Sequence, residues 1–137
     1  MTSYKTSKYT LNVFGLLLFF AVFGVMAILS LGYSFPEYAH LVDWIPGVTA
    51  FQPHASNFVF GCGVMLLYGV VRIMYDAGRA ELLIAALVIA AVNAGYELFL
   101  PIENTRDPLD AISGVVGTVL GLGAILMIRK AGLKLNT

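Results

Sequence analysis

Four long apolar runs constrain the fold of this chain more than any other feature. They cover about residues 11–31, 53–75, 82–100 and 108–128. Each is close to the roughly 20 residues that a helix needs to cross the hydrocarbon of a bilayer. In hydrocarbon the backbone must satisfy its own hydrogen bonds, which favours helices. The sequence therefore predicts an all-α fold, an integral membrane four-helix bundle that forms a single domain over residues 1–137.

The composition agrees with a membrane protein. Hydrophobic residues make up 59% of the chain and charged residues 12%, whereas a soluble domain has about 25% charged residues. The formal net charge is zero, so the chain lacks the basic surface of a nucleic-acid-binding protein. Cys62 is the one cysteine and lies in an apolar run, where we expect it to be a small buried hydrophobe.

Basic residues flanking the runs predict the orientation, because cytoplasmic loops of membrane proteins are enriched in Lys and Arg. Seven basic residues flank the runs on one side of the membrane, and Arg106 is the only one on the opposite, outer side. We therefore expect both termini to be cytoplasmic and the first run to be an uncleaved span, since it is longer than the apolar part of a signal peptide. The seven residues on the predicted cytoplasmic side are Lys5, Lys8, Arg72, Arg79, Arg129, Lys130 and Lys134.

The two outer connections differ in character. The long one, residues 32–52, carries aromatic side chains and few charges, which favours short pieces lying along the membrane interface. The short one, residues 101–107, contains Arg106. Asp107 is a suitable N-cap and Pro108 a suitable first residue for the last helix.

Polar residues recur at helical spacing on the last three runs, in each case toward the predicted outer end. If the stripes face one another, their polar members form one small pocket there. The stripes are His54, Asn57 and Gly61; Ala86, Ala90, Asn93 and Glu97; and Asp110, Gly114, Gly117 and Gly121. The predicted ligand-binding residues are Glu97, Arg106, Asp110, His54, Asn57 and Asn93.

Each charged member also has a purely structural interpretation. Asp110 complements the helix dipole near the start of the last helix. Arg106 is equally a loop charge paired with a neighbouring carboxylate, a kind of pair worth about 0–1 kcal/mol. Glu97 can reach the interface from the end of its span, and His54 can be an interfacial histidine without a ligand.

No catalytic or metal-binding pattern stands out. His40, His54 and the carboxylates show no metal-ligand spacing, and Ser113 has no histidine at a recognisable distance along the chain. We therefore expect no cofactor and no metal. Catalysis with Glu97 as a base stays open, but we favour an activity other than catalysis. Gly117 and Gly121 form a GxxxG pair that Gly114 and Ala124 extend, which predicts close helix packing inside the bundle or against a partner.

The segment from Glu97 to Gly121 resembles the signature of the VanZ-like family of small bacterial membrane proteins. The matching residues are Glu97, Arg106, Asp110, Gly117 and Gly121, and His54 matches a histidine that opens an earlier span. Leu100 and Gly114 stand where the family pattern often has Gln and Asn. The resemblance implies a multi-pass protein of the bacterial inner (plasma) membrane with a role at the cell envelope, where the family is associated with low-level resistance to the glycopeptide antibiotic teicoplanin.

Two functions follow as hypotheses. In the first, the outer polar pocket binds a lipid headgroup or a cell-wall precursor. In the second, the chain is a non-catalytic accessory or assembly subunit of a larger membrane complex, or a homo-oligomer joined through the glycines of the last helix. The expected partners are membrane lipids and one of these protein assemblies.

Overall fold

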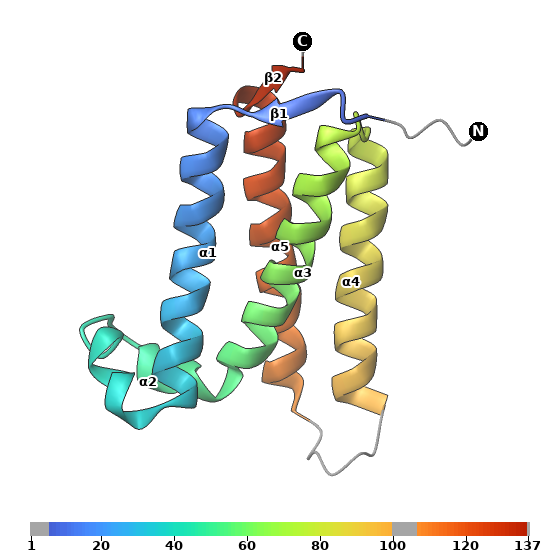
Figure 1. Ribbon diagram of the computed structural model, residues 1–137. Helices are drawn as coiled ribbons and strands as arrows, with labels where there is room; N and C mark the ends of the chain where they lie inside the picture. Colours follow the sequence, from blue (N-terminus) through green and yellow to red (C-terminus); the bar gives the residue numbers. More distant parts are fainter. Residues whose placement is uncertain (1–5, 100–106, 137) are drawn as a thin grey trace.

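Four long helices stand side by side in the computed structural model, which describes residues 6–99 and 107–136 (Figure 1). All four are long and apolar enough to cross a membrane. This confirms the predicted helical bundle, and the helix bounds agree with the predicted runs to within a few residues. The long helices are α1 (Val13–Ser34), α3 (Ala55–Met74), α4 (Arg79–Phe99) and α5 (Pro108–Ala131).

Two of these helices begin at well-formed caps. The Asp107 side chain accepts a hydrogen bond from the Leu109 backbone N–H at 2.8 Å, and Pro108 is the first residue of α5, as the sequence predicts. At α1, Asn12 Oδ1 accepts a hydrogen bond from the Gly15 N–H at 2.9 Å. Such caps satisfy backbone donors that have no partner within the helix.

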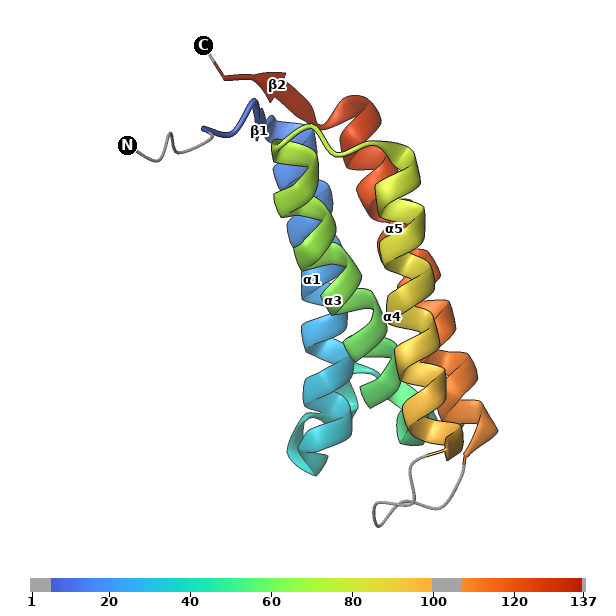
Figure 2. The same cartoon turned by 90° about the vertical axis from the view of Figure 1, so that its right-hand side faces the viewer.

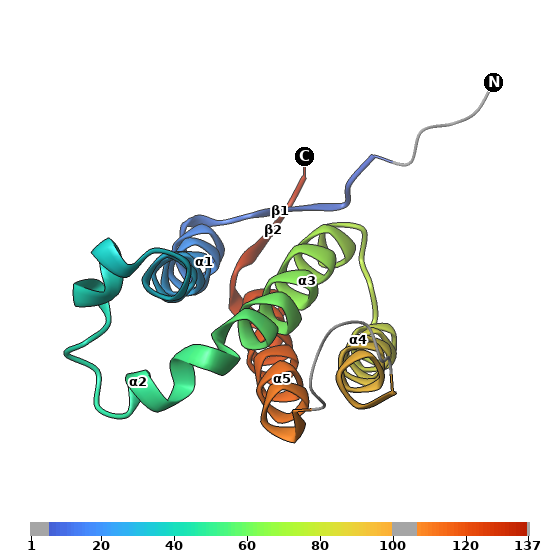
Figure 3. The same ribbon diagram turned by 90° about the horizontal axis from the view of Figure 1, so that it is seen from below.

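Helix α3 lies at the centre of the bundle. Its most extensive contact is with α5, while α1 and α4 flank this pair on opposite sides (Figure 3). Figure 2 shows α4 running beside α5 over most of its length. The core holds the fully buried side chains Met65, Leu66, Ile73, Leu82, Ile125 and Ile128.

Glycines allow α3 and α5 to approach closely. A Cβ on Gly61 would collide with the Gly114 carbonyl oxygen, and a Cβ on Gly117 with the Phe58 carbonyl oxygen. A Cβ on Gly121 would lie 2.8 Å from the Cys62 carbonyl oxygen. The glycine face of α5 is therefore used inside the bundle, against α3.

Two short strands close one end of the bundle, which we call the strand end. Strand β1 (Tyr9–Leu11) pairs antiparallel with β2 (Leu133–Leu135), so the first and last described segments lie at this end together with the turn between α3 and α4 (Figure 1). Lys8 Nζ lies 2.6 Å from Asp76 Oδ2. This carboxylate raises the pKa of the Lys8 ammonium. The sequence analysis did not predict these strands.

The long connection between α1 and α3 folds into short helical pieces, as expected. They are η1 (Pro36–Leu41), α2 (Val48–Phe51) and η2 (Gln52–His54). Together with the starts of α3 and α5 and the end of α4, they form the opposite end of the bundle (Figure 1), which we call the polar end.

Candidate functional site

His54 and Asp110 meet at the polar end. His54 is the last residue of η2 and Asp110 lies in the first turn of α5. His54 Nδ1 is 2.7 Å from Asp110 Oδ1, and the two side chains are 16% and 15% exposed. The hydrogen bond holds the imidazole in one orientation. The structure thus brings together two residues that are 56 positions apart in the chain.

Asp107 and Ser113 complete this cluster. Asp107 Oδ1 caps α5, while its Oδ2 lies 3.7 Å from His54 Nδ1. Ser113 Oγ lies 2.9 Å from the carbonyl oxygens of both His54 and Asp110. The hydroxyl therefore ties the start of α3 to the start of α5. From the sequence, Asp107 was expected to cap α5 or to pair with Arg106, and Ser113 was considered only as a nucleophile that lacks a nearby histidine.

The same cluster contains the chemistry of a divalent metal site. One imidazole nitrogen and two carboxylate oxygens, from His54, Asp107 and Asp110, lie within 4.8 Å of one another. Nitrogen and oxygen ligands of this kind suit zinc and similar ions. No spacing rule reveals the set, because η2 and α5 are far apart in the sequence.

Asn93 and Glu97 form the buried polar face of α4 at this end. Each residue is 4% exposed. Glu97 has a polar interaction partner. The Asn93 amide packs against Gly114. Its Oδ1 is buried and has no hydrogen-bond partner within the described part of the chain. An unsatisfied buried acceptor costs about 1–3 kcal/mol, which a hydrogen-bond donor that reached this atom would offset.

A groove between α3 and α4 runs past Asn93. We call it the Asn93 groove, and it has a volume of about 450 Å³. Apolar side chains provide most of its surface, with polar groups from both helices among them. It is lined by Ser56, Asn57, Phe60, Val92, Asn93 and Tyr96.

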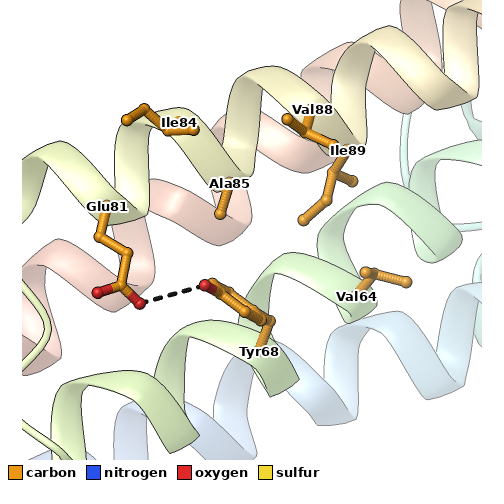
Figure 4. Close-up of a pocket in the computed structure, with 7 residues that line it drawn as sticks. All are labelled: Val64, Tyr68, Glu81, Ile84, Ala85, Val88 and Ile89. Atoms are coloured by element: carbon orange, nitrogen blue, oxygen red, sulfur yellow. Dashed lines mark hydrogen bonds between the residues drawn. The ribbon is translucent and has the colours of Figure 1, made fainter.

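A second groove lies between the same helices, closer to the strand end (Figure 4). Its volume is about 530 Å³. The Tyr68 hydroxyl donates to Glu81 Oε1 at 3.2 Å (Figure 4), and Arg72 Nε donates to the same oxygen. The interface of α3 with α4 is thus apolar in its middle and polar toward both ends.

The predicted site residues fall into two neighbouring groups. His54 and Asp110 bond to each other, and Asn57 and Asn93 line one groove one helical turn away. Glu97 lies one turn beyond Asn93 on α4, toward the polar end. Arg106 and Leu100 lie outside the described residues.

Comparisons of this chain with protein-family models, curated proteins and solved structures found no match.

Proposed function

We propose that this protein is a multi-pass, VanZ-like protein of the bacterial inner membrane that binds the polar headgroup of a lipid or cell-wall precursor at its polar end. One observation carries the proposal. Asn93 Oδ1 is a buried acceptor without a partner among the described residues, and the same residue lines a groove between two helices that are apolar enough to cross a membrane.

The chemistry of the groove favours an amphiphilic ligand. Asn57, Asn93 and Tyr96 offer neutral hydrogen-bonding groups, while Phe60 and Val92 offer apolar surface. A hydroxyl or amide of the ligand would donate to Asn93 Oδ1, and an alkyl chain would lie along the apolar middle of the interface. Arg106 would contact a phosphate or carboxylate of the headgroup.

The packing of Asn93 on Gly114 supports the family resemblance. Gly114 stands where the family pattern often has Asn. A side chain on position 114 would enter the space that the Asn93 amide now fills. Helix α4 therefore supplies an amide, that of Asn93, beside position 114 of α5.

The distribution of charge supports the orientation that we propose. Basic residues are concentrated at the strand end, which the positive-inside rule assigns to the cytoplasm. The polar end, with His54 and Asp110, then faces the outside of the inner membrane. The described basic residues at the strand end are Lys8, Arg72, Arg79, Arg129, Lys130 and Lys134.

Genetic complementation tests the proposal. The double variant Glu97→Ala/Arg106→Ala should fail to restore teicoplanin tolerance to a strain that lacks the gene, whereas the wild type and His40→Ala should restore it. His40 is a matched control because its ring is exposed and, among the described residues, bonds only to the Glu37 carbonyl oxygen. Equal membrane levels of all three proteins are verified by immunoblot. Full complementation by the double variant contradicts the proposal.

The accessory-subunit alternative has a separate structural support. On another face, α1, α3 and α5 form an apolar groove of about 450 Å³ whose lining includes Leu18, Phe58 and Met127. A partner helix would fit such a surface. The glycines do not offer that contact, because Gly114, Gly117 and Gly121 pack within the bundle.

Purification in mild detergent followed by mass spectrometry separates the two functions. A stoichiometric partner protein favours the accessory subunit. A monomer that carries a small amphiphile favours headgroup binding.

A further inference from the structure

Acidic side chains at the strand end are all paired with particular cations within the described residues. Asp76 pairs with Lys8, and Glu81 pairs with Arg72. Four cations at this end then remain without a carboxylate partner in the described part of the chain. They are Arg79, Arg129, Lys130 and Lys134.

Three of these four cations line one pocket. This Arg79 pocket has a volume of about 410 Å³ and is formed by Arg79, Leu126, Met127, Arg129 and Lys130. It lies where α4 begins and α5 ends. Arg129 Nε donates to the Ala77 carbonyl oxygen at 3.1 Å, which leaves the two terminal nitrogens of its guanidinium for another acceptor.

Helix dipoles account for two of the cations but not for the third. Arg129 and Lys130 lie in the last turn of α5, where a positive charge is favourable. Arg79 is the first residue of α4, and a cation at a helix N-terminus is unfavourable. The nearest carboxylate on its own helix, Glu81, is engaged by Arg72. The position of Arg79 therefore favours an external anion.

We propose that the Arg79 pocket binds the phosphate of an anionic phospholipid. Arginine binds phosphate through paired N–H groups, and lysine adds a compact positive charge. Leu126 and Met127 supply apolar surface for the start of an acyl chain. A soluble anion would not use that surface, whereas basic pockets beside the ends of membrane helices suit anionic headgroups.

This site is independent of the headgroup site at the polar end, which lies at the opposite end of the bundle. The lipid here belongs to the leaflet at the strand end. Failure of either proposal leaves the other intact.

Native mass spectrometry of the full chain in mild detergent tests the proposal. The lipids are phosphatidylglycerol and phosphatidylcholine with identical acyl chains. The wild type should bind phosphatidylglycerol more tightly. Because one cation near an anionic headgroup contributes about fivefold in affinity, Arg79→Gln/Lys130→Gln should weaken phosphatidylglycerol binding by about 25-fold. Arg129 is kept because it also bonds to Ala77.

Two further variants make the result decisive. Lys134→Glu changes the net charge by the same amount at the same end but outside the pocket, and should leave the affinity nearly unchanged. Arg79→Lys/Lys130→Arg should retain the preference for phosphatidylglycerol. The proposal is overturned if the wild type binds both lipids equally, if Lys134→Glu weakens binding as much as the double Gln variant, or if inorganic phosphate displaces the lipid at equal concentration.

Discussion

The side-chain amide of Asn93 on α4 lies against the α-carbon of Gly114 on α5. A Cβ at position 114 would clash with the amide atoms, with Nδ2 at 2.6 Å. Since Asn93 is only 4% exposed, its amide has little room to move aside. This contact fixes the spacing of α4 and α5 beside the Asn93 groove.

Gly114→Ala should therefore destabilise the protein by about 1–3 kcal/mol, the usual cost of overpacking. Asn93→Ala in the same chain should recover most of that loss, because it removes the atoms that the new methyl group meets. Denaturant unfolding in detergent, followed by circular dichroism, measures both effects. An equal loss of stability in the single and double variants would contradict the contact.

Gly117 and Gly123 provide a matched pair of positions on α5. A Cβ on Gly117 meets the backbone of Phe58, whereas a Cβ on Gly123 meets nothing within 4 Å. Gly117→Ala should cost about 1–3 kcal/mol because backbone cannot yield easily. Gly123→Ala should be neutral or should stabilise the helix by up to about 1 kcal/mol. Thermal unfolding of the two variants in the same detergent checks this difference, and equal midpoints would show that the α3–α5 contact is wrong.

The hydrogen bond between His54 and Asp110 predicts coupled substitutions. His54→Ala and Asp110→Ala should each destabilise the protein, and a bond to a charged group is worth about 1.5–3 kcal/mol. The double variant should lose less than the sum of the two single losses. His40→Ala serves as the control, because the exposed His40 ring bonds to a backbone carbonyl of its own helix, η1, and to no other group in the described part of the chain. Strict additivity in the double-mutant cycle would mean that the two side chains do not interact.

Asn12 links the start of α1 to the end of α5 at the strand end. Its Oδ1 caps α1, and its Nδ2 donates to the Ala131 carbonyl oxygen at 2.8 Å. Asn12→Ala should cost about 1–2 kcal/mol from the cap alone. Asn12→Asp retains the capping oxygen but loses the donor, so its stability should fall between those of the wild type and Asn12→Ala. An Asn12→Ala protein as stable as the wild type would contradict the role of this residue.

Much of the bundle could be predicted from the sequence, because a run of about 20 apolar residues has few alternatives to a helix. Asp107 and Pro108 marked the start of α5 through local capping chemistry. Asn93 and Glu97, which lie on one stripe at helical spacing, are both buried, as the hypothesis of facing stripes requires.

Other features depend on which helices become neighbours, and periodicity does not contain that information. The pairing of β1 with β2 requires the two tails to meet at one end in a particular register. Asn12 interrupted an apolar run in the sequence but proved to be a cap. Arg72 was counted only as a flanking charge, whereas its bond to Glu81 depends on the packing of α3 beside α4.

The candidate site, like the fold, could be predicted from the sequence only in part. Helical spacing predicted that His54 and Asp110 would lie at the same end, and they bond directly. The contact of Asn93 with Gly114 and the unpaired Asn93 Oδ1 depend on the exact rotation of α4 against α5. Hydropathy specifies such rotations only to within the width of a helix face.

If a ligand binds at Asn93, it should accompany the protein through purification, and mass spectrometry of the bound amphiphiles will detect it. Wild type, Asn93→Leu and the control Arg79→Gln/Lys130→Gln are purified in mild detergent, and their bound amphiphiles are extracted and quantified by mass spectrometry. Leucine has a similar size and removes the unpaired acceptor, so Asn93→Leu should be at least as stable as the ligand-free wild type.

An amphiphile with a polar headgroup should be present in the wild type and in the Arg79→Gln/Lys130→Gln control and be reduced at least about tenfold in Asn93→Leu, the effect of losing one hydrogen bond worth about 1.5 kcal/mol. Phospholipid from the Arg79 pocket should instead be retained in Asn93→Leu and reduced in the control. The same content in all three proteins, or no amphiphile in the wild type, would contradict ligand binding at Asn93.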